Sequence, residues 1–290
     1  MTDHTTDRGW FADLAPGSVD GAREAIDTGS AADPTDWPQR AVDAGFAEGE
    51  ADYYELLHEA TVAATRAAVV DRERADDKQL LHAVRAMDDA TRTANELAER
   101  LSEWAGTLFD DAGTGVDAAR GLADREPATP LEARVVSLAE RVDDLASEAD
   151  ELQAFIERQA PAVAPNLSEM AGPVLTARLI ALAGGLEQLA KKPSGTVQVL
   201  GAEDALFAHL AGRGSSPKHG IIYTHEYVSG TRPEDRGSAA RAFAGKLSIA
   251  ARVDHYSGER RPEIHDDLDD RMSTIRARGT DGDDTTEGSQ

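Results

Sequence analysis

The chain has 290 residues, a length that allows roughly two or three domains, and it contains no cysteine, which excludes disulfides, thiolate nucleophiles and thiolate metal sites. No apolar stretch approaches the roughly 20 residues of a membrane span and the N-terminus has no signal-peptide pattern, so we expect a soluble cytoplasmic protein without a membrane partner. Its 54 acidic and 30 basic residues give a net charge of -24, opposite in sign to that of an ordinary nucleic-acid-binding protein and typical of a salt-loaded (halophilic) cytoplasm.

Residues 1–50 form the first region and are rich in glycine, aspartate and alanine. Pro16, Pro34 and Pro38 break any long helix, and strand-like alternation is scarce. We interpret this region as a small domain or as a partly disordered segment.

Residues 51–160 have a helical pattern. Between Leu80 and Trp104 apolar residues recur at steps of three and four, which predicts one long helix with a single apolar face. That face contains Leu80, Val84, Met87, Thr91, Ala94, Ala98 and Leu101. A connection over residues 110–130, which we expect to be a loop, leads to a second helical pattern.

The second pattern repeats leucine every seven residues, the spacing of a coiled coil. Its apolar positions are Leu131, Val135, Leu138, Val142, Leu145, Ala149, Leu152 and Ile156. Two such helices predict an extended antiparallel hairpin. The alternative is that both helices line an ordinary globular core.

Residues 161–278 are predicted to form a compact helical domain, and residues 279–290, which contain no apolar side chain, a disordered acidic tail. The acidic residues are distributed unevenly along the chain. Residues 1–160 hold 36 acidic and 15 basic residues, whereas residues 161–278 hold 14 acidic and 15 basic residues. Within that domain, residues 188–225 contain only two acids and residues 237–253 none. Surfaces without carboxylates indicate an anionic partner.

The first acid-poor window contains the turn Lys191-Lys-Pro-Ser-Gly-Thr196. Ser194 or Thr196 can cap the next helix, and two ammonium groups beside free helical amides favour phosphate. The order of residues is not that of a nucleotide-binding P-loop. An ordinary capped loop with solvated lysines explains the spacing equally well.

In the second window Arg241 and Arg252 lie eleven residues apart and therefore share one face of a helix, flanked by Arg236 and Lys246. Such a row suits contacts to phosphates rather than to bases. A solvated helix face is the alternative.

Catalytic and metal-binding patterns are missing from the sequence. The eight histidines show no metal-ligand spacing, and neither a nucleophile elbow nor a Gly-x-Gly-x-x-Gly turn occurs. We expect no enzyme activity, no metal and no cofactor on this chain.

An ordered series of motifs resembles the Nop family, in particular the archaeal fibrillarin-associated Nop proteins related to Nop56 and Nop58. The match extends over about residues 50–278. Its motifs are Tyr53–Leu57, Asp77–Val84, Glu103-Trp104, Ala164–Ser168, Ala177–Ile180, Leu189–Glu203, Pro217–Tyr223 and Ala250–Asp254, with Gly9-Trp-Phe11 as a fragment of the N-terminal domain.

The resemblance implies a mainly α fold with a small N-terminal domain, a coiled-coil hairpin that pairs two copies, and an all-helical Nop domain. It implies a non-catalytic scaffold of the box C/D guide-RNA 2′-O-methylation particle, which binds kink-turn RNA together with a kink-turn-binding ribosomal-type protein. Fibrillarin, bound by the N-terminal domain, would supply S-adenosylmethionine and the chemistry. The implied contact residues are Lys191, Lys192, Ser194, Thr196, Gln198, Gly201, Ala202, Glu203, Lys218, His219, Arg241, Lys246 and Arg252.

Two other functions stay open at this point. The chain could serve a different RNA particle through the same domain, in which case fibrillarin would not accompany it. It could also be an acidic helical adaptor that binds only proteins, in which case the lysines of the 191–196 turn would not matter for RNA.

Overall fold

The structure is a computed structural model that describes residues 9–12, 14–15, 18–28 and 35–277, and these residues form helices and turns without a β-strand. The mainly α fold is therefore confirmed. The chain divides into two compact units, Met1–Ala75 and Asp76–Gln290. The predicted disorder of the tail after residue 278 lies outside the described residues.

The N-terminal unit has an aromatic core. Its helices are α1 (Val19–Thr28), α2 (Trp37–Asp43) and α3 (Glu50–Glu73). Phe11, Phe46 and Tyr53 are buried, and the indole Nε1 of Trp10 donates a hydrogen bond of 3.1 Å to the Tyr53 hydroxyl. Aromatic side chains bury large areas, so a few of them can hold a small unit together. The described part of residues 1–50 thus belongs to a compact unit, and Trp10 and Phe11 contribute to its core.

Helix α3 is the last element of this unit. The unit ends at Ala75. The only fully buried side chains of α3 are Tyr53 and Ala60, which lie in its first half.

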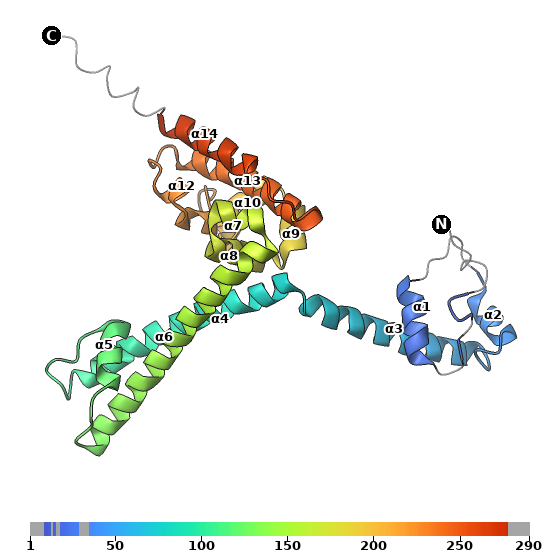
Figure 1. Cartoon of the computed structure of the whole chain (residues 1–290), viewed down its shortest axis with the longest axis horizontal. Helices are drawn as coiled ribbons and strands as arrows, with labels where there is room; N and C mark the ends of the chain where they lie inside the picture. Colours follow the sequence, from blue (N-terminus) through green and yellow to red (C-terminus); the bar gives the residue numbers. More distant parts are fainter. Residues whose placement is uncertain (1–8, 13, 16–17, 29–34, 278–290) are drawn as a thin grey trace, which may run out of the picture. The chain divides into compact units, whose positions relative to one another are not determined.

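The second unit begins with a helical hairpin, α4 (Asp76–Ala105) and α6 (Pro130–Val163), which is visible in Figure 1. The start of α4 shares a core with the end of α6, since Leu80 and Val84 cluster with Ile156. The end of α4 clusters with the start of α6, since Leu101 joins Val135. This pairing makes the hairpin antiparallel, as predicted.

The connection between the two long helices is not the loop that we expected. It contains α5 (Gly115–Ala123), which lies at the far end of the hairpin in Figure 1. Ala119 and Leu122 are buried against α4 and α6, because apolar residues three apart give even a nine-residue helix one face to bury.

The leucines that repeat every seven residues lie on the flank of α6 rather than on its buried face. The residues buried in the hairpin include Val135, Val142 and Ile156, whereas Leu131 is 48% exposed. The three later leucines, Leu138, Leu145 and Leu152, are half-buried. The hairpin therefore keeps an apolar row, which we name the leucine row, incompletely covered.

In the described residues up to Ala277, eight α-helices and one 3-10 turn follow the hairpin, and this part of the chain lies at one end of the hairpin in Figure 1. They are α7 (Pro165–Ala171), α8 (Pro173–Ala183), α9 (Leu186–Lys191), α10 (Ser194–Val199), α11 (Glu203–Leu210), η1 (Ile221–Thr224), α12 (Glu226–Ser229), α13 (Arg236–Tyr256) and α14 (Glu263–Ala277). Helix α13 runs through the core, where Phe243 and Leu247 are almost fully buried.

One buried carboxylate joins the start of this domain to its end. Asp254 of α13 accepts hydrogen bonds from the backbone amides of Asn166 (3.0 Å) and Leu167 (2.9 Å) at the start of α7, and from the Asn166 side chain (2.6 Å). Burial raises the pKa of Asp254, and these hydrogen bonds oppose the rise. The carboxylate supplies the acceptors that the first turn of α7 lacks.

Candidate nucleic-acid interface

The turn between α9 and α10 presents polar groups to solvent. Ser194 and Thr196 are exposed, whereas Val197 directly behind them is fully buried. Neither hydroxyl caps α10, because its N-cap residue is Pro193 and no side-chain cap is formed, which corrects the expected cap. Both hydroxyls therefore remain available to a partner.

The two lysines of this turn differ in their surroundings. Lys191 forms an ion pair of 2.6 Å with Glu187 one turn earlier, which raises the pKa of Lys191. The side-chain ammonium of Lys192 has no hydrogen-bond or ion-pair partner anywhere in the described part of the chain. We regard Lys192 as the cation of the turn that is free to bind an anion.

Arg252 brings a further positive charge to the same place. Its Nε donates a hydrogen bond of 3.2 Å to the Ala190 carbonyl at the end of α9, and the residue is otherwise exposed. The bond orients the guanidinium beside the turn, with its remaining N–H groups free to donate. Lys192 and Arg252 thus form a cationic pair, supplied by two helices, that the sequence alone did not place together.

At the other end of α10 a loop is held tightly against the helix. The Gln198 side chain donates to the Lys218 carbonyl (2.7 Å), and the Gly220 amide donates to the Gln198 carbonyl (2.8 Å). A Cβ atom on Gly220 would overlap the Leu200 carbonyl oxygen, so only glycine fits there. Gln198 therefore positions Lys218 and His219 and is itself partly engaged.

The loop carries an aromatic and cationic surface. The rings of His219 and Tyr223 stack with centroids 4.5 Å apart and an interplanar angle of 18°, and the Arg236 guanidinium lies 5.5 Å from the Tyr223 ring centre. Tyr223 is 38% exposed. Burial lowers the pKa of His219, as do Arg236 and Lys218, so the imidazole is neutral near pH 7. We name His219, Tyr223 and Arg236 the stacking platform.

The platform contains two residues that are not among the contact residues implied by the resemblance. Tyr223 falls in a matching motif, but the motif gives no sign of its stack, and Arg236 stands out in the sequence only as a flanking charge. The sequence signal that could have pointed to Tyr223 is its position four residues after a histidine within an acid-poor window.

The turn after α10 has a structural role. Gly201 has a φ of 83°, and its amide donates to the Glu203 carboxylate (2.9 Å). This left-handed backbone conformation favours glycine. Within the described structure Glu203 thus stabilises the turn at Gly201-Ala202.

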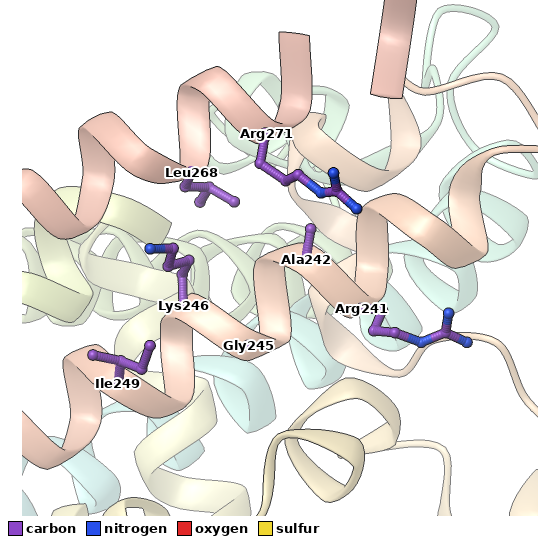
Figure 2. Close-up of a pocket in the computed structure, with 7 residues that line it drawn as sticks. All are labelled: Arg241, Ala242, Gly245, Lys246, Ile249, Leu268 and Arg271. Carbon is purple, nitrogen blue, oxygen red and sulfur yellow. The ribbon is translucent and has the colours of Figure 1, made fainter. Parts of the chain in front are cut away.

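Two of the expected contact residues border a groove between α13 and α14. Figure 2 shows Arg241 and Lys246 on α13 at a groove whose other wall is α14. Lys246 forms an ion pair of 2.7 Å with Asp267 of α14. The structure therefore places Lys192, Arg252 and the stacking platform around α10, and Lys246 on another side of α13.

Within the described residues, no helix is both long and apolar enough to cross a bilayer. Nor does the described part of the chain bring three or more metal-ligating side chains together.

A protein-family profile described as "snoRNA binding domain, fibrillarin", the Nop profile, matches residues 129–275. The chain is 32% identical over 271 residues to an uncharacterized NOP5 family protein of Methanocaldococcus jannaschii, covering 81% of this chain and 66% of that protein. It is 43% identical over 123 residues to nucleolar protein 56 of Schizosaccharomyces pombe, covering 42% of this chain and 25% of that protein. It is 32% identical over 218 residues to nucleolar protein 58 of the same yeast, covering 62% of this chain and 43% of that protein.

The chain thus spans less than two thirds of the length of these relatives. Among solved structures, a chain of a fibrillarin/Nop5p complex is similar with a TM-score of 0.54 and 22% identity, and the match covers 93% of this chain and 99% of that one. At this identity the similarity supports the fold. The profile runs from the start of α6 to two residues before the end of α14, and it therefore includes both the cationic pair and the stacking platform.

Proposed function

Because the chain belongs to the Nop family, we propose that it is a non-catalytic scaffold of a box C/D guide-RNA 2′-O-methylation particle. Its Nop domain binds kink-turn RNA together with a kink-turn-binding protein. Its N-terminal unit recruits fibrillarin, which carries S-adenosylmethionine. The chain itself holds no cofactor and performs no chemistry.

The observation that carries the proposal is the surface around α10. Lys192 and Arg252 offer charge-assisted hydrogen bonds to phosphate at one end of the helix. At the other end, the stacking platform offers an aromatic face to an unpaired base. Phosphate contacts fix the position of an RNA, and a base on an aromatic face is typical of single-stranded loops and bulges.

The exposed hydroxyls of Ser194 and Thr196 lie between these two contacts in sequence and support a protein partner. Hydrogen bonds between neutral groups are screened less by salt than phosphate contacts are. In a cytoplasm of high ionic strength, contacts of this kind would retain affinity that ion pairs lose. We therefore assign the kink-turn protein to this part of the surface.

The hairpin and the N-terminal unit carry the remaining partners. The leucine row supports self-association of two copies through α6. Since Trp10 and Phe11 are used in the aromatic core, the fibrillarin contact falls on other surfaces of the N-terminal unit.

The experiment is a salt-resolved capture of the full chain by guide RNA that already holds its kink-turn protein. The double variant Lys192→Glu with Arg252→Glu should bind more weakly, and the slope of log affinity against log salt should fall by about 1 for each phosphate that the variant no longer binds. Arg158→Glu, an exposed change on α6, is the matched control. Unchanged binding by the double variant would favour a protein-only adaptor, and RNA capture without fibrillarin in native purifications would favour another RNA particle.

A further inference from the structure

The groove between α13 and α14 has no place in the proposed RNA contact around α10. It has a volume of about 270 Å³ and is lined by Arg241, Ala242, Gly245, Lys246, Ile249, Leu268 and Arg271. Three of these residues are cations, and Lys246 is neutralised by Asp267. The guanidinium groups of Arg241 and Arg271 form neither an ion pair nor a hydrogen bond with any described residue. The groove is therefore lined by two guanidinium groups that have no counter-charge among the described residues.

The floor of the groove leaves room for the backbone of a peptide segment to lie against α13. Ala242 and Gly245 present no long side chain at its centre, and Figure 2 shows Arg271 extending over Ala242 with Arg241 at the same end. A segment in this groove could approach α13 closely and meet Arg271 there, with Arg241, which projects outward from α13, at the rim of the same end. Two arginines in such an arrangement favour carboxylate or phosphate.

A segment with matching charge follows α14 directly in the sequence. Residues 279–290 (GTDGDDTTEGSQ) carry Asp281, Asp283, Asp284 and Glu287 and no basic group. Gly279 and Gly282 allow the chain to reverse its direction at little cost. Helix α14 itself carries Asp266, Asp267, Asp269 and Asp270, and segment 279–290 adds four more carboxylates directly after that helix.

The distances allow the segment to reach the groove. Arg271 precedes the last residue of α14, Ala277, by six positions, or about 9 Å along the helix. Extended chain spans about 13 Å from Ala277 to Asp281 and about 23 Å to Asp284. Covalent attachment over so short a distance gives a local concentration in the millimolar range, so individually weak ion pairs suffice.

We propose that the groove between α13 and α14 binds the acidic segment 279–290 of the same chain, with its carboxylates paired to Arg241 and Arg271. The segment then acts as an internal competitor, because a polyanion that needs these arginines must first displace it. The docking does not depend on the proposed function.

The test uses the full chain and requires no RNA. Because the sequence has no cysteine, Ser289→Cys gives one site for a nitroxide label. In the ¹⁵N-labelled chain the amide signals of Gly245 and Ile249 should broaden. The broadening should disappear when Asp281, Asp283 and Asp284 are changed to asparagine and Glu287 to glutamine. It should also disappear in the Arg271→Glu variant. In the exposed control Arg158→Glu it should persist.

Two results would overturn the docking. The first is that the amide signals of Gly245 and Ile249 do not broaden, or that they broaden equally when the segment is neutral. The other is broadening that grows with protein concentration, since the segment would then occupy a second copy. Failure of this test leaves the capture of RNA by the α10 surface unaffected, and failure of RNA capture leaves this test interpretable.

Discussion

At the scale of single residues, the contact surface around α10 depends on Gly220, a position where no side chain fits. Gly220 brings its main chain so close to the Leu200 carbonyl that a methyl group would overlap it. The same approach aligns the Gln198 bond to the Lys218 carbonyl. His219 and Tyr223, on either side of Gly220 in the sequence, stack because of this local geometry. The stacking platform is therefore a consequence of backbone packing.

The first prediction concerns Tyr223. Replacing Tyr223 by alanine removes the ring on which a base would stack and should weaken RNA binding by about 1–3 kcal/mol, as measured by titration of the guide RNA with its kink-turn protein. Tyr223→Phe keeps the ring and should bind nearly as well as the wild type. Tyr54→Ala, at an exposed tyrosine of the N-terminal unit, controls for general effects of losing an aromatic side chain. Equal binding by Tyr223→Ala and the wild type would exclude a stacked base.

At the scale of helices, α13 organises the domain because both of its ends are fixed. Near its C-terminus Arg252 joins it to α9 and Asp254 joins it to α7. At its N-terminus Arg236 donates to the carbonyl groups of Ser229 and Thr231 around α12. The cationic pair and the stacking platform therefore keep their separation, since one rigid helix carries an arginine of each.

The second prediction concerns the capping of α7. Asp254→Ala leaves three buried or partly buried donors without an acceptor and should lower the free energy of unfolding by about 2–5 kcal/mol, measured by urea denaturation. Asp270→Ala, at an exposed position on α14, should change it by less than about 0.5 kcal/mol. If both variants unfolded at the same urea concentration, the Asp254 bonds would be unimportant for the fold.

The third prediction concerns the leucine row. A charge at Leu138 or Leu145 should disrupt pairing of two copies, so sedimentation equilibrium should show a monomer for the double variant Leu138→Glu with Leu145→Glu. Ser147→Glu, on the exposed side of α6, should leave association intact. Because the hairpin is acidic, salt should strengthen pairing of the wild type. A wild type that is monomeric at every salt concentration would contradict this assignment.

At the scale of the whole chain, periodicity predicts the long elements but not the short ones. The row from Leu80 to Leu101 is buried as expected, apart from the exposed Thr91, because thirty residues average out local exceptions. Helix α5 escapes prediction because nine residues give a weak periodic signal. The aromatic core of the N-terminal unit is equally hard to foresee, since it joins Phe11 to Tyr53 across a proline-rich stretch.

The contact surface is predictable in composition but not in arrangement. The scarcity of acid around residues 188–225 identifies the region, and motifs name most of its polar residues. Pairing of Lys192 with Arg252, and of His219 with Tyr223 and Arg236, depends on how α9, α10 and α13 pack. Sequence spacing carries no information on such contacts between helices.

The chain's central role in the proposed particle is to connect the guide RNA to the methyltransferase. The measurement is retention of fibrillarin on immobilised guide RNA with its kink-turn protein, with and without the full chain. We predict retention, and S-adenosylmethionine-dependent methylation of a complementary RNA, only when the chain is present, and much less with the Lys192→Glu and Arg252→Glu variant. Equal retention of fibrillarin without the chain would contradict the account.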